Sequence, residues 1–115
     1  MRTDRETFEA LAAQALDELP QWVRDRMVNV EIVIEEGPPR GEPNLLGRYH
    51  GIPLTQRGSH YAGVLPDTIT LYRRTIEREA DTHDQLRAAI VHTIEHEVAH
   101  FFGISDTRLR DMDRY

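Results

Sequence analysis

The chain of 115 residues has no cysteine, no lysine and no apolar run of the length that crosses a bilayer. Without cysteine the protein forms no disulfide, and a bound metal ion has to be held by imidazole and carboxylate groups. A membrane-spanning helix needs about 18 apolar residues in succession, so none is expected. Residues 1–6 are mostly charged and lack the apolar centre of a secretory signal. We therefore expect a cytoplasmic location.

The balance of charge is acidic, with 20 aspartates and glutamates against 14 arginines and a formal net charge of −6. The longest basic run is Arg73-Arg74, which argues against a nucleic-acid-binding surface. Apolar residues make up 39% of the chain and charged residues 30%, as in a soluble globular protein. Since a chain of this length supports one modest hydrophobic core, we expect a single domain over residues 1–115. The composition predicts no particular oligomeric state.

Capping patterns and apolar spacing predict two long helices. Thr3 with Glu6 forms a capping-box pattern, and the helix that it opens should end near Leu19 because a proline follows. Thr82 with Gln85 repeats the pattern and predicts a second helix that begins close to residue 83. Alternating or short apolar stretches predict three strands, over residues 28–36, 45–49 and 67–72.

These elements predict an α+β fold, in which the N-terminal helix and the second helix pack against a small twisted sheet of three or four strands. The strand over residues 67–72 should lie close to the second helix because the connection between them is short. A helical turn that follows the first helix is expected to place Trp22, Val23 and Met27 in the core. Residues 107–114 should form a short charged helix.

The second helix carries the motif H-E-x-x-H, formed by His96, Glu97 and His100. Residues four apart lie one above the other on a helix, so the two imidazoles can reach one metal ion. Glu97 lies about 100° around the helix from His96, where its carboxylate can touch a metal-bound water without being a ligand. This pattern is typical of zinc hydrolases in which the glutamate is the general base.

Gly103 and Asp106 follow His100 at intervals of three residues. Glycine readily adopts the left-handed conformation that ends a helix and reverses the chain, so Asp106 can return to the metal as a third ligand. Two imidazoles and one carboxylate leave a fourth position for water, as in catalytic zinc sites. The alternative is a solvated, histidine-rich helix face with Gly103 and Asp106 as ordinary caps. It accounts for each residue singly but not for the joint spacing.

A second motif, H-x-x-E-H, overlaps the first and runs from His92 to His96. This inverted zinc signature needs a further carboxylate ligand well downstream, and only 19 residues follow His96. Asp106 already fits the forward motif, which we therefore prefer. His92 then lies one turn earlier on the same face, as a partner that supports a ligand, a substrate contact or a solvated bystander.

The extended pattern H-E-x-x-H-x-x-G-x-x-D resembles the long zinc-binding consensus of metzincin-type peptidases, in the variant with aspartate as the last ligand. The small size of the chain and one further run resemble the minimal zincin-like metallopeptidases of bacteria, the run being Tyr61-Ala62-Gly63-Val64-Leu65-Pro66-Asp67. The likeness extends from Thr3 to about Arg110. It implies a zincin-like fold and one zinc ion as cofactor. Met112 is the one methionine after the motif that could form a Met-turn.

The resemblance implies a peptidase that hydrolyses peptide bonds in a peptide or protein substrate through a zinc-activated water. The zinc ligands of the family map onto His96, His100 and Asp106, and its general base maps onto Glu97. The alternative is a zinc-binding or interaction module on the same scaffold without proteolysis. That module shares every ligand, but a pure binding site does not require Glu97, which favours the enzyme.

Residues 53–63 form a polar, turn-prone stretch that contains His60 and Tyr61. Zincin-like enzymes flank the metal with an edge strand that pairs with an extended substrate. We expect such a strand in or beside this stretch, or in the strand over residues 67–72. His60 and Tyr61 are candidates to contact the substrate or stabilise an oxyanion, and the alternative is an ordinary surface loop.

Overall fold

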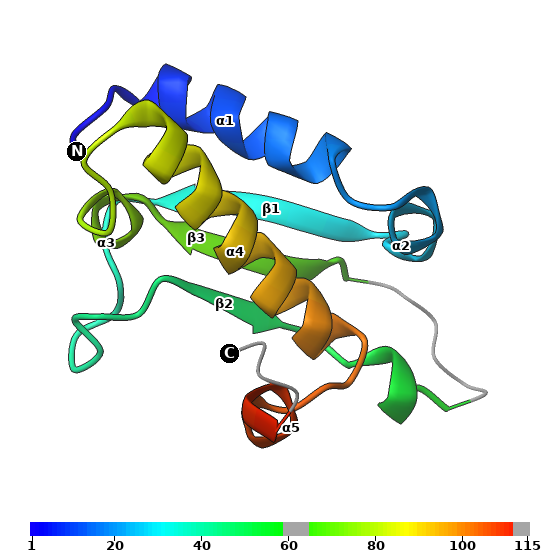
Figure 1. Ribbon diagram of the computed structural model, residues 1–115. Helices are drawn as coiled ribbons and strands as arrows, with labels where there is room; N and C mark the ends of the chain where they lie inside the picture. Colours follow the sequence, from blue (N-terminus) through cyan, green and yellow to red (C-terminus); the bar gives the residue numbers. More distant parts are fainter. Residues whose placement is uncertain (59–64, 112–115) are drawn as a thin grey trace.

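Strand β3 (Asp67–Tyr72) is the central strand of a three-stranded sheet with the order β1-β3-β2 (Figure 1). In this computed structural model, which describes residues 1–58 and 65–111, β1 (Val30–Glu35) is parallel to β3 and β2 (Gly47–His50) is antiparallel to it. The α+β prediction is confirmed, and β3 has the bounds predicted from its alternation. Strand β1 is shorter than the predicted range, since residues 28 and 29 form a turn, and β2 begins two residues later and ends one residue later than predicted.

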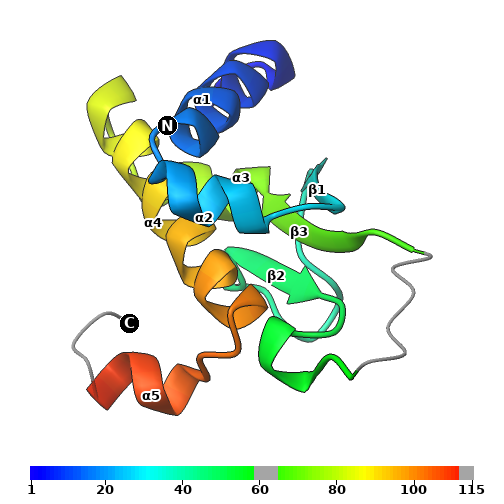
Figure 2. The ribbon, with the colours of Figure 1, turned by 90° about the vertical axis from the view of Figure 1, so that its right-hand side faces the viewer.

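Two long helices, α1 (Arg5–Asp17) and α4 (His83–Phe101), lie over the same face of the sheet (Figures 1 and 2). Between them and the sheet lies the hydrophobic core, which includes Phe8, Ala12, Ile69, Leu71, Ile76, Leu86, Ile90 and Ile94. Helix α4 contacts α1 on one flank and both β2 and β3 beneath it. The side of α4 that contacts neither α1 nor the sheet carries polar residues near the C-terminal end of the helix.

The start of α4 was predicted correctly, but the cap of α1 was not. Thr82 caps α4, because its Oγ1 accepts the N–H of Gln85 at 3.1 Å. Helix α1 is instead capped by Asp4, whose Oδ1 accepts the N–H of Thr7 at 2.7 Å. Aspartate and threonine are both good caps, and the hydroxyl of Thr3 is taken by the carboxylate of Glu77 at 2.6 Å. The contact with Glu77 therefore takes the Thr3 hydroxyl away from the helix and leaves the capping role to Asp4.

The remaining helices are short: α2 (Gln21–Arg26), the 3-10 turn η1 (Leu54–Gln56), α3 (Arg73–Glu77) and α5 (Asp106–Asp111). The prediction that Trp22 is a core residue is wrong, because its side chain is 59% exposed whereas Val23 is buried. The short helix α2 turns only one side toward the core, and Val23 occupies that side. Trp22 lies on another side of α2, where its ring contacts the ring of Phe102. Within the residues described, no helix is long and apolar enough to cross a membrane.

A buried carboxylate, Glu77, joins α3 to the N-terminal segment. Its side chain is 2% exposed, and its oxygens accept the N–H and hydroxyl of Thr3 at 2.9 and 2.6 Å and the guanidinium of Arg74 at 2.7 Å. Burial by itself would raise the pKa of Glu77, but these hydrogen bonds outweigh it and lower the pKa below its usual value.

We expect Glu77→Gln to lower the free energy of unfolding by about 2 kcal/mol near neutral pH, because charged hydrogen bonds in a buried place are lost. A carboxyl whose pKa is lower in the folded state stabilises it fully above the unfolded pKa, which is near 4.5, and loses that effect as the pH falls further. Chemical denaturation at pH 7 and pH 3 should therefore give a smaller difference between parent and variant at pH 3. A difference that does not change with pH would contradict this account.

Candidate metal centre

The C-terminal half of α4 presents His96 and His100 on one flank, one turn apart. Their rings meet edge to face, with centroids 4.8 Å apart and an angle of 73° between the planes. The side chains are 15% and 25% exposed. The opposite side of the helix is fixed in the core by Ile90 and Ile94. The apolar side of α4 therefore sets the direction in which both imidazoles point.

Helix α4 ends at a glycine turn, as the sequence predicts. Gly103 has a φ of 91°, in the left-handed region that favours glycine. Its N–H donates to the carbonyl of His100 and the N–H of Ile104 to that of Ala99, both at 2.9 Å, which is the hydrogen-bond pattern of a Schellman motif. The chain then reverses, and Asp106 is the first residue of α5.

The turn brings Asp106 back to the two imidazoles. Its Oδ1 lies 3.1 Å from Nε2 of His96 and 2.6 Å from Nε2 of His100. Partial burial by itself would raise the pKa of Asp106, but the hydrogen bond with His100 and the nearby His96 outweigh it and lower that pKa below its usual value. The three side chains that the motif singled out thus converge on one point.

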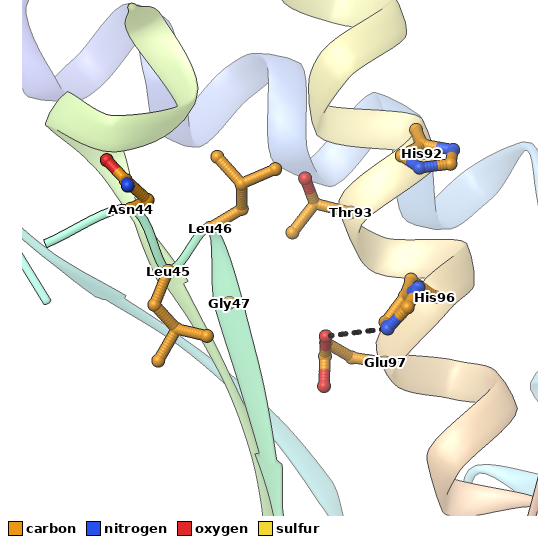
Figure 3. A pocket seen from close by; sticks show the side chains of 8 residues that line it. All are labelled: Asn44, Leu45, Leu46, Gly47, His92, Thr93, His96 and Glu97. Atoms are coloured by element: carbon orange, nitrogen blue, oxygen red, sulfur yellow. Dashed lines mark ion pairs between the residues drawn. The ribbon is translucent and has the colours of Figure 1, made fainter. Parts of the chain in front are cut away.

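Glu97 lies beside this point but is held in a different way. The residue is 5% exposed, its Oε1 accepts the backbone N–H of Tyr49 at 2.8 Å, and the same oxygen lies 3.1 Å from Nδ1 of His100. Its other oxygen, Oε2, lies 4.0 Å from Nε2 of His96 (Figure 3). When Nδ1 of His100 faces Glu97, Nε2 is the ring nitrogen that faces Asp106 and can bind a metal ion.

Two carboxylates are thus close enough to complete a metal site with the histidines. His96, Glu97 and His100 offer ligand atoms within 4.8 Å of one another, whereas Asp106 contacts both Nε2 atoms directly. A tetrahedral zinc ion with bonds near 2.1 Å separates its ligand atoms by about 3.4 Å, so Oδ1 of Asp106, which lies 3.1 and 2.6 Å from the two Nε2 atoms, would move away from His100 to admit an ion. The donor set of two imidazoles and one carboxylate fits zinc, and the carboxylate can come from Asp106, which contacts both Nε2 atoms, or from Glu97.

A cavity of about 320 Å³ lies between α4 and the start of β2, directly beside His96 and Glu97. Figure 3 shows its walls, which are formed by Asn44, Leu45, Leu46, Gly47, His92, Thr93, His96 and Glu97. His92 is exposed on this wall, and its ring centroid is 6.5 Å from that of His96. Glu95 of the overlapping inverted motif lines a different, apolar groove with Trp22. The structure therefore places the forward motif, not the inverted one, at a single site.

Three of the residues considered from the sequence, His60, Tyr61 and Met112, lie outside the described residues. The strand beside the metal centre is β2, which precedes the stretch at 53–63 and pairs with β3 alone in the part of the chain described. The suggestion that the strand over residues 67–72 is this edge strand is wrong, because β3 is the central strand. Strand order depends on long-range pairing, which one sequence does not reveal.

Sequence reasoning missed the backbone N–H of Tyr49, which binds Glu97. It also missed the ion pair of Arg57 and Asp67, which Tyr49 contacts through its hydroxyl. Gly47 carried a signal that could have directed attention to β2, since glycine within a strand often marks a close approach of another element. A Cβ at position 47 would lie 2.9 Å from both Thr93 Cγ2 and the carbonyl of Thr70. The glycine therefore lets α4 pack closely on β2, which brings Glu97 within reach of Tyr49.

We expect Gly103→Ala to be more damaging than Gly41→Ala, although the two glycines have φ values of 91° and 92°. Alanine in this conformation costs about 1–2 kcal/mol at either position. A Cβ meets nothing within 4 Å at position 41, whereas at position 103 it overlaps Thr55. The displaced turn should move Asp106, so the affinity for a metal ion should fall in Gly103→Ala alone. Equal changes in thermal stability and metal affinity would show that the contact with Thr55 is unimportant.

Comparison with known proteins agrees with this geometry. The family model described as zincin-like metallopeptidase matches residues 27–115. A solved structure, a conserved hypothetical protein from Thermus thermophilus, is similar with a TM-score of 0.62 and 23% sequence identity, over 87% of this chain and 94% of that chain. That likeness shows the fold alone, and no curated protein matches the chain. Because the family match covers most of the chain, the chain belongs to the zincin-like metallopeptidase family.

Proposed function

We propose that the protein is a zinc-dependent peptidase with one catalytic zinc ion. The observation that carries the proposal is the contact of one carboxylate oxygen of Asp106 with Nε2 of both His96 and His100, 3.1 and 2.6 Å away. The buried residue Glu97 directly follows His96 on α4, and a cavity lies beside it. Ligands, a base and space for a substrate thus occur together.

His96, His100 and Asp106 would hold the ion. A bound zinc ion supplies Lewis acidity, which polarises a substrate carbonyl and makes water a nucleophile near neutral pH. His100 has its Nδ1 against Glu97, which keeps the ring in the orientation that presents Nε2 to Asp106. The contact with Glu97 therefore supports the ring orientation that a zinc ligand needs.

Glu97 is the general base in this proposal. The backbone N–H of Tyr49 holds Oε1, at 2.8 Å, while Oε2 is directed toward the His96 side of the cavity (Figure 3). Oε2 can accept the proton that water loses during attack and return it to the leaving amine. Because the backbone of β2 holds Oε1, the carboxylate has less orientational freedom to lose in the transition state.

The substrate would lie along the outer edge of β2, in the cavity. Alternate residues of an antiparallel edge strand direct their N–H and C=O groups away from the partner strand. The carbonyl of Leu46 faces β3, since it accepts the N–H of Tyr72 at 2.9 Å, so Gly47 and Tyr49 face outward. The N–H of Tyr49 is taken by Glu97, which leaves Gly47 as the residue for backbone pairing with an extended peptide.

The decisive experiment is cleavage of a diverse peptide library by the protein reconstituted with zinc, with products identified by mass spectrometry. We expect cleavage that a chelator abolishes and added zinc restores. The absence of cleavage by a protein that holds one equivalent of zinc would contradict the peptidase proposal. It would favour the zinc-binding module on a zincin scaffold, in which Glu97 only orients His100.

A further inference from the structure

A buried carboxylate without a part in the proposed chemistry is linked to Glu97 through Tyr49. Asp67, the first residue of β3, is 3% exposed. Its Oδ2 accepts the hydroxyl of Tyr49 at 2.6 Å and also the guanidinium of Arg57, with which it forms a buried ion pair. One oxygen atom therefore joins the edge strand β2 to the segment around η1.

The first connection leads to the proposed base. Tyr49 offers its hydroxyl to Asp67 and its backbone N–H to Glu97. Its ring packs edge-on against Phe101, with centroids 6.0 Å apart. Burial and the hydrogen bond to Asp67 raise the pKa of the Tyr49 hydroxyl, so the hydroxyl is a donor at neutral pH. The side chain of Tyr49 thus pins the strand position that holds Glu97.

The second connection leads to the turn that carries Asp106. Arg57 donates from Nε to the carbonyl of Ile52 at 2.8 Å, and its guanidinium lies 5.4 Å from the ring centroid of Phe101, the last residue of α4. The segment that Arg57 closes places Thr55 directly against Gly103. The ion pair of Arg57 and Asp67 therefore holds the segment whose Thr55 contacts the chain reversal at Gly103.

We propose that Asp67 is a positioning residue for both halves of the metal centre, acting on Glu97 through Tyr49 and on Asp106 through Arg57. The first half rests on the proposed function, since it concerns the base. The second half concerns the affinity for zinc and is independent of cleavage. Loss of the Tyr49 hydroxyl should therefore impair catalysis, and loss of the Arg57 guanidinium should impair zinc binding. Loss of the Asp67 carboxylate should impair both.

The test compares Tyr49→Phe, Arg57→Met and Asp67→Ala in zinc affinity, measured by competition with a chromophoric chelator, and in kcat and KM for a peptide substrate. We expect Tyr49→Phe to lower kcat about 10-fold with KM and zinc affinity unchanged, because Glu97 is less firmly placed. Arg57→Met should weaken zinc binding about 10-fold, because the segment that contacts the turn at Gly103 is held less firmly and Asp106 is less well placed. Asp67→Ala should show both defects.

Glu77→Gln is the matched control, because it removes another buried, hydrogen-bonded carboxylate away from the centre. It should lower the melting temperature and leave zinc affinity and kcat as in the parent. The proposal is overturned if Tyr49→Phe and Arg57→Met lose only thermal stability, as this control does. If the parent does not cleave peptides but Arg57→Met still weakens zinc binding, the metal half stands while the peptidase proposal fails.

Discussion

Glu97→Gln is expected to bind zinc as tightly as the parent and to lose roughly 1,000-fold in kcat, within the range that general acid–base groups contribute. Glutamine has the shape of glutamate, and its carbonyl oxygen can still accept the N–H of Tyr49 and a hydrogen bond from His100, as Oε1 of Glu97 does. The amide cannot accept a proton from water. The variant therefore separates the chemical role of Glu97 from its structural one.

The measurement pairs single-substrate kinetics with the zinc content of the purified protein. Glu95→Gln is the matched control, because Glu95 is an exposed residue of the same helix that lines a different groove, and it should behave as the parent. A variant at position 97 that cleaves at the rate of the parent would refute the role as base. Loss of zinc from that variant would instead identify Glu97 as a ligand.

Asp106→Ala is expected to weaken zinc binding by more than about 100-fold, which exceeds the usual cost of losing an outer partner of a metal site. Its Oδ1 contacts Nε2 of both histidines, so its removal leaves two imidazoles to hold the ion. His96→Ala should have an effect of similar size. Both variants should lose activity at limiting zinc because the site is empty, and not because the chemical step is slower.

Chelator competition and elemental analysis distinguish the two candidate ligand sets. If Asp106 is the third ligand, Asp106→Ala loses zinc and Glu97→Gln keeps it. If the set is His96, Glu97 and His100, which also lie close together, the outcomes are reversed. Because Asp106 is half exposed, its removal leaves no buried group unpaired, and thermal stability without zinc should change little. A large fall in stability would mean that Asp106 is mainly structural.

The parts of the protein that could be predicted from the sequence are those in which neighbours along the chain decide the geometry. The flank shared by His96 and His100 follows from helical periodicity, and the turn at Gly103 follows from the backbone freedom of glycine. The start of α4 and the bounds of β3 follow from a cap and from strict alternation. Each of these depends on interactions within a few residues.

Where several local solutions were equally good, packing made the choice. Asp4 caps α1 and Thr3 bonds to Glu77, 74 residues away in the sequence. Trp22 fits the apolar pattern of its segment but lies outside the core. Neither outcome follows from propensity, because the deciding contact comes from another element.

The amino-acid order by itself thus determined which side chains can bind a metal ion and how the chain turns to bring them together. Only the tertiary structure decided that β2 is the strand beside these side chains and that Tyr49 holds Glu97 across 48 positions of sequence. It also decided that Asp67 and Arg57 form an ion pair that Tyr49 contacts. The physical reason is that a helix or a turn is made by hydrogen bonds between near neighbours, whereas the strand order and the buried ion pair depend on how whole elements pack.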